Sequence, residues 1–157
     1  MKKVLRSFAV GGSLNKGTFL AFLLKLKFED GSEMLTAWAK PQIPVLFQIL
    51  LEYQQYLHHV GVHLDPDSIE KTIRAEAPTL SLAEIENLPV QAVVETATGH
   101  VQKDNVLAVS IKRAKQEGTE VFLVAPNQCE WLIGFIANTL NEFGENGELS
   151  VPTGPLH

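Results

Sequence analysis

Apolar and polar residues alternate along parts of this chain with the two-residue period of a half-buried strand. The pattern is clearest in residues 18–29, where Leu24, Leu26 and Phe28 share one face and charged residues occupy the other. The same reading predicts five further strands, at residues 3–10, 33–39, 90–98, 105–116 and 120–125.

Glycines mark the predicted strand ends and hairpin turns. Because glycine weakens a strand interior, Gly11-Gly12 and Gly99 are expected to end the strands that precede them. Asp30-Gly31 is typical of a two-residue type I′ hairpin, in which both central residues need positive φ. Glu117-Gly118 takes the corresponding place between two later strands.

A helical period follows each set of strands. Residues 44–59 and 128–143 carry apolar stripes at helical spacing: Leu46, Ile49, Leu50, Tyr53 and Leu57, then Leu132, Ile136, Leu140 and Phe143. Asn127 is the expected N-cap of the second helix, and Gly61 and Gly144 the expected stops. Shorter helices are predicted at 66–75 and 81–88, where Ser81 and Glu84 match a capping box.

The two sets of elements also repeat in sequence. At an offset of 87, Gly12–Glu33 falls on Gly99–Glu120 with seven identities in 22 positions. We predict an α+β fold of two tandem βββα repeats related by a pseudo-twofold axis, with antiparallel sheets covered by helices. A bulge within 18–29 would make each unit ββββα. The repeats, 3–59 and 90–143, form one domain (1–143) with a helical acidic segment at 60–89 between them, and 144–157 is a flexible tail.

This duplicated plan resembles the Whirly proteins and the purine-rich-element-binding proteins over residues 3–143. The resemblance is one of topology and implies binding of single-stranded nucleic acid. Basic residues of the strands would contact phosphates (Lys2, Lys3, Arg6, Lys16, Lys25, Lys27, Lys103, Lys112, Arg113 and Lys115). Phe8, Phe19 and Trp38 are the aromatic candidates for base stacking, although a place in the core explains them more simply.

Charge points to a different partner. The net charge is −5 and the isoelectric point about 5.5, whereas binding to phosphates favours clustered basic charge. Residues 1–59 are net +3, while residues 60–95 hold seven acidic and two basic residues. We therefore predict that the acidic segment binds a basic protein, through Asp65, Asp67, Glu70, Glu76, Glu84 and Glu86.

In size, acidity and lack of motifs the chain is also similar to bacterial immunity proteins. That similarity implies an inhibitor of a basic partner such as a nuclease toxin. The sequence hypothesis is thus a non-enzymatic protein-binding module, most simply an inhibitor, with single-stranded nucleic-acid binding as the alternative.

Residues able to carry other chemistry are few. His59 and His63 have the spacing of a helical metal pair, but with His58 they also suit the end of a helix, where its dipole favours cations. Cys129 lies near the start of a predicted helix, where it could be a reactive thiolate with His100 as its base. The alternative is that Cys129 is a small buried residue that fills space in the core. We expect no metal, no cofactor and no catalytic residues. A single cysteine, no signal peptide and no apolar stretch of membrane-spanning length predict a cytoplasmic protein without a membrane span.

Overall fold

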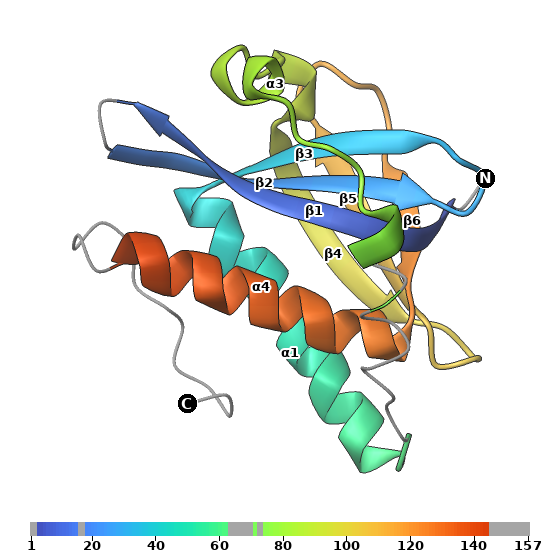
Figure 1. Ribbon diagram of the computed structural model, residues 1–157. Coiled ribbons are helices and arrows are strands. Elements are labelled where there is room, and N and C mark those ends of the chain that lie inside the picture. Colours follow the sequence, from blue (N-terminus) through green and yellow to red (C-terminus); the bar gives the residue numbers. More distant parts are fainter. Residues whose placement is uncertain (1–2, 16–17, 63–70, 72–73, 145–157) are drawn as a thin grey trace.

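The computed structural model describes residues 3–15, 18–62, 71 and 74–144, with the side chains of 14–15, 18–20 and 142–144 left aside (Figure 1). The fold is α+β, as predicted. Its strands are β1 (Lys3–Asn15), β2 (Thr18–Phe28), β3 (Glu33–Ala39), β4 (Val94–Val101), β5 (Leu107–Arg113) and β6 (Glu120–Val124). Its α-helices are α1 (Ile43–His59), α3 (Leu82–Glu86) and α4 (Pro126–Gly144), with 3-10 turns at Lys40–Gln42 and Val90–Ala92.

All six strands belong to one mixed sheet in the order β3-β2-β1-β6-β5-β4. Each set of three is an antiparallel meander, but β1 and β6 join the two sets in parallel through Lys3↔Phe122 and Val4↔Leu123. The prediction of antiparallel sheets therefore holds within each meander and is wrong for the sheet as a whole, which is single and mixed. The sheet curves so far that its two end strands approach each other, and Ala37 of β3 forms a bridge with Val93.

The strand order tests one placement of the predicted twofold axis, perpendicular to the sheet. Such an axis through the sheet would reverse the order of the second set and place β1 beside β4, or β3 beside β6. Instead β1 lies beside β6, and equivalent strands run in the same direction. The second meander thus follows the first by a step of three strands along the sheet, which excludes a perpendicular axis. The sheet curves until Ala37 and Val93 form a parallel bridge like the parallel contact of β1 with β6, so a twofold axis along the centre of the curved sheet would give the same step, and the pseudo-twofold relation stays a prediction. The offset of 87 nevertheless carries over to the register, because Gly12↔Phe22 in β1–β2 corresponds to Gly99↔Val109 in β4–β5.

Several strand boundaries differ from the sequence prediction. β2 is unbroken from Thr18 to Phe28, so the ββββα alternative is wrong. Gly11-Gly12 and Gly99 lie inside β1 and β4 instead of ending them. The reason at Gly99 is close packing: a Cβ there would lie 2.6 Å from Ile49 Cγ2 of α1.

The hairpin between β2 and β3 is one residue longer than predicted. Gly31 alone has positive φ (87°), whereas a type I′ turn would need Asp30 to have it as well. Gly31 N–H donates to the Phe28 carbonyl and Phe28 N–H to the Ser32 carbonyl, which encloses a three-residue loop. Gly118 also has positive φ (77°) and, like Gly31, lies two residues before the strand that follows it. The β5–β6 loop is longer, however, because Glu120 pairs with Ile111 whereas Glu33 pairs with Lys27.

The two long helices were predicted within two residues. Gly61, with φ of 73°, follows α1 and donates to the His58 carbonyl. α4 starts at Pro126, so Asn127 lies inside its first turn and is not the N-cap, and Gly144 is its last helical residue. Proline suits the first turn because its missing N–H has no partner there in any case. No helix among the described residues is long and apolar enough to span a membrane.

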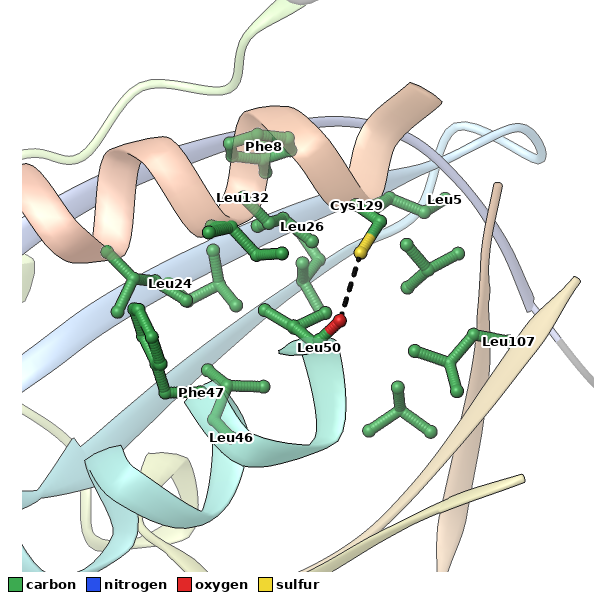
Figure 2. Packing of buried hydrophobic residues seen from close by; sticks show 14 of the residues in the cluster. Leu5, Phe8, Leu24, Leu26, Leu46, Phe47, Leu50, Leu107, Cys129 and Leu132 are labelled. Carbon is green, nitrogen blue, oxygen red and sulfur yellow. Dashed lines mark hydrogen bonds between the residues drawn. The ribbon is translucent and has the colours of Figure 1, made fainter. Parts of the chain in front are cut away.

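α1 and α4 pack against the concave face of the sheet and form the main core with it (Figure 2). Leu24 and Ile111, the two strand residues predicted to point inward, are each 1% exposed. The helix residues predicted to meet them are buried as well: Leu46, Leu50, Tyr53, Leu132, Ile136 and Leu140. Phe8 and Trp38 are also buried in this core, so neither offers a ring to a base.

Candidate partner-binding surface

The part of the inter-meander segment that carries α3, residues 81–88, lies on the convex face of the sheet, opposite α1 and α4 (Figure 1). Ile85 and Leu88 pack there on a small second core formed by Ala21, Leu23, Ala37 and Ala92. The predicted capping box is present, because Ser81 Oγ accepts from Glu84 N–H and the Glu84 carboxylate accepts from Ser81 N–H. These contacts fix the short helix α3 on β2 and β3.

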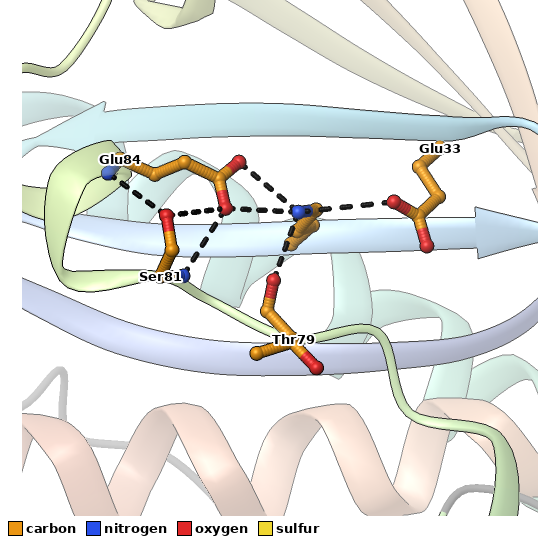
Figure 3. Close-up of polar contacts among 5 residues, drawn as sticks. Glu33, Thr79, Ser81 and Glu84 are labelled. Atoms are coloured by element: carbon orange, nitrogen blue, oxygen red, sulfur yellow. Dashed lines mark hydrogen bonds and ion pairs between the residues drawn. The ribbon is translucent and has the colours of Figure 1, made fainter.

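Lys25 of β2 anchors this segment from below (Figure 3). Its Nζ lies 3.0 Å from both carboxylate oxygens of Glu84, donates to the Thr79 carbonyl at 2.8 Å and lies 3.7 Å from Glu33. The lysine side chain is only 13% exposed. The hydrogen bond from Lys25, followed by that from the Ser81 backbone, lowers the pKa of Glu84. Glu84 is therefore a charged group held against the sheet.

Glu76 is held in the same way by β1. The Arg6 guanidinium contacts both carboxylate oxygens, with Nη2 donating to Oε1 at 2.7 Å. Buried Ser7 donates from its hydroxyl to the Glu76 carbonyl at 2.7 Å. Hydrogen bonding to Arg6 is the main reason why the pKa of Glu76 is lowered. Two carboxylates of the acidic segment thus pair with two basic residues of the first meander.

These pairs change the interpretation of both predicted surfaces. Sequence reasoning assigned Glu76 and Glu84 to a partner, and Arg6 and Lys25 to nucleic acid, but in the structure they bind one another. Opposite charge excesses in residues 1–59 and 60–95 are the sequence signal that an internal pairing would leave. Arg6 and Lys25 therefore neutralise carboxylates of this chain, and nucleic-acid binding by the remaining basic residues stays a prediction. Phe19 falls among the side chains left aside.

Of the six predicted partner-binding residues, Glu86 alone is both described and exposed. Asp65, Asp67 and Glu70 lie outside the described residues, so their role stays a prediction. Sequence reasoning missed Leu82, which shares α3 with Glu86 and is 68% exposed. Residues four apart on a helix are neighbours on its surface, so α3 presents one apolar and one acidic side chain together.

The candidates for other chemistry have ordinary structural places. Cys129 is fully buried, its Sγ lies 3.4 Å from the Leu50 carbonyl, and burial raises its pKa. Cys129 is therefore a protonated thiol packed between α4 and α1. His100, the base considered for it, lies exposed on β4. His58 and His59 are exposed at the end of α1, and His63 is outside the described residues. Among the residues that are described, no three His, Cys, Asp or Glu side chains come together as metal ligands would.

Comparison with known proteins adds no relative to this picture: no protein-family model, curated protein or solved structure matches the chain.

Proposed function

We propose that this protein is a non-enzymatic protein-binding module that docks a basic partner through the outer side of α3. The proposal rests on the opposite orientation of the two glutamates of this helix. Glu84 is drawn against the sheet by Lys25, whereas Glu86 is exposed on the same helix as Leu82. One glutamate positions the helix and the other is available to a partner.

The chemistry of this surface suits a protein partner. An exposed leucine on a rigid helix can fill an apolar pocket with little loss of conformational entropy, since the capping box and Lys25 already fix the backbone. A neighbouring carboxylate then selects a basic residue at the rim of that pocket. The acidic balance of the segment favours approach of a positively charged protein over other proteins.

An inhibitor or immunity-type protein that neutralises a basic partner, such as a nuclease toxin, is the form of this function that we propose. A nuclease binds a polyanion, so its active-site surface is basic and complements an acidic inhibitor. Asp65, Asp67 and Glu70 would extend the contact N-terminally along the chain from α3.

We further infer that the two meanders are tandem copies. The shared offset of sequence and register in the first hairpin of each copy supports this inference. The segment that carries α3 is then an addition between the copies, which fits a role separate from that of the shared framework.

The test begins with co-purification of a basic protein on the wild-type chain from a lysate of its source cell. Binding of that protein is then measured for Leu82→Ser and Glu86→Gln, with Val60→Ser and Glu29→Gln as controls of the same chemistry at exposed sites away from α3. We expect Leu82→Ser to weaken binding about tenfold to a hundredfold, as removal of an interface anchor does. Glu86→Gln should mainly slow association and reduce its dependence on salt.

The controls should bind like the wild type. Equal binding by the wild type, Leu82→Ser and Glu86→Gln would overturn the proposed surface. A triple variant, Asp65→Asn/Asp67→Asn/Glu70→Gln, tests the rest of the predicted patch separately. If this variant alone lost affinity, the partner would bind the acidic segment but not α3.

A further inference from the structure

The two ends of the sheet are not alike. At the β3 end, Ala37 forms a bridge with Val93, and the Leu35 carbonyl accepts from Arg113 Nη1 at 3.4 Å. At the β4 end, the Glu95 carbonyl accepts from the Gln42 side chain at 3.0 Å. Beyond that point, β5 is the only strand among the described residues that pairs with residues 96–101.

Backbone directions along this part of β4 follow from one hydrogen bond. Gln102 N–H donates to the Val106 carbonyl at 2.8 Å, so Gln102 faces β5. In an antiparallel pair, successive residues direct their N–H and C=O groups to alternate sides. Thr98 and His100 therefore face β5, and the backbone groups of Ala97, Gly99 and Val101 point away from it.

An open row of donors and acceptors is a template for another strand, and natural edges are commonly blocked by proline, a bulge or an inward-pointing charge. The stretch TATGHV at 96–101 has no proline and no Lys, Arg, Asp or Glu. The irregularity in the β4–β5 pairing lies before it, between Val94 and Thr96. This part of the edge is therefore unprotected.

We propose that the β4 edge pairs with the β4 edge of a second copy of this chain. A twofold dimer places the two strands antiparallel. The outward-facing groups are centred on Gly99, so the matching register sets Gly99 against Gly99 and Ala97 against Val101 of the second copy. Glycine at the centre leaves no side chain in the way, and residues 95–100 other than half-buried Ala97 are exposed.

Charge complementarity supports the same register. Pairing about Gly99 brings Glu95 of one copy to the end of the ladder that holds Lys103 of the other. Both residues are exposed, and Glu95 also holds Lys112 of its own chain at 2.6 Å. The twofold axis produces this opposite-charge pair twice. A short, largely polar strand pair buries a small area, so the dimer is expected to be weak and to form at high protein concentration.

Sedimentation of the purified chain over a concentration series tests the proposal. We expect a reversible monomer–dimer equilibrium. Lys103→Glu should raise the dimer dissociation constant about tenfold, because it places like charges at both ends of the ladder. The double exchange Glu95→Lys/Lys103→Glu should restore dimerisation. Lys115→Glu, which makes the same charge change in the exposed β5–β6 turn, is the matched control.

A cross-linking experiment tests the register. The pairing sets Thr98 opposite His100 of the second copy, so mild oxidation of a mixture of Thr98→Cys and His100→Cys chains should give disulfide-linked dimers. Either variant alone should give far fewer, and Cys129 is buried. A chain that stays monomeric at high concentration would overturn the proposal. So would a dimer that Lys103→Glu does not weaken and that these cysteines do not trap.

Discussion

Gly99 offers a sharp test of how α1 packs on β4. Substitution Gly99→Ala would add a Cβ 2.6 Å from Ile49 Cγ2 and 3.4 Å from Leu107 Cδ1. Carbon atoms in proteins pack best at about 3.5–4.0 Å, so the contact with Ile49 is about 1 Å too short. The new methyl group can be accommodated only if α1 or β4 moves.

The expected magnitude combines two opposing effects. Overpacking of this kind destabilises a protein by about 1–3 kcal/mol. Replacing glycine with alanine in a strand recovers about 0.5–1 kcal/mol, because the unfolded chain becomes less flexible. We therefore expect Gly99→Ala to lower the free energy of unfolding by about 1–2 kcal/mol.

Urea denaturation followed by tryptophan fluorescence, with dilute monomeric protein, measures this effect in a double-mutant cycle. Ile49→Ala removes the Cγ2 atom that collides, so Gly99→Ala should be much less harmful in that background, with a coupling of about 1–2 kcal/mol. Ile49→Val keeps the branched γ carbons and should give no such relief. Gly134→Ala is the control on α4: it meets nothing within 4 Å and should stabilise the protein by about 1 kcal/mol. If Gly99→Ala were neutral, or additive with Ile49→Ala, the packing of α1 on β4 would be refuted.

Four further measurements follow from the same contacts. Leu24→Ala and Ile111→Ala should each lower the free energy of unfolding by about 2–5 kcal/mol; a denaturation curve shifted by much less would contradict their burial. Lys25→Met should destabilise the protein at neutral pH, and its difference from the wild type should shrink on acidification. The pKa of Glu84 is lowered in the fold, so its contribution is present above the ordinary carboxylate pKa of about 4.3 and is lost as pH falls through the lowered value; a difference independent of pH would exclude this pairing. Cys129 should react with a thiol reagent only as fast as the protein unfolds, since burial raises its pKa and shields it; fast labelling of the native protein would contradict this. Fluorescence anisotropy should find no binding of single-stranded oligonucleotides tighter than about 10 μM at physiological salt, in view of the net negative charge; tight, salt-sensitive binding would favour the nucleic-acid alternative.

The elements themselves were largely predictable because their signals are local. Alternation at Leu24, Leu26 and Phe28 and the helical stripe around Leu50 each arise from one buried face, which a short window of sequence records. β3 was predicted with the bounds that it has. Gly11 and Gly99 misled the prediction because the reason for each glycine lies elsewhere in the chain. Leu80 approaches the first and Ile49 the second, and the local sequence records neither contact.

The arrangement of the elements could not be predicted from patterns of this kind. The halves of the sheet join through two residue pairs. No local pattern of residues around Val4 indicates that it pairs with Leu123. The candidate site shows the same limit. Composition identified the acidic segment, but Glu84 and Glu86 are two residues apart with opposite orientations, and only the contact with Lys25, 59 residues earlier, distinguishes them.

The parallel contact between β1 and β6 has a consequence for synthesis of the chain. The strand pairs within the first meander join residues that are near one another in sequence, so this meander can assemble before the second half of the chain is made. Lys3 and Val4, however, must wait for Phe122 and Leu123, near the end of the described chain. Until then the outer edge of β1 is unpaired, and an unpaired strand edge is where other chains attach. The nascent protein is therefore most exposed to aggregation, and most in need of a chaperone, during the interval between completion of its first half and arrival of β6.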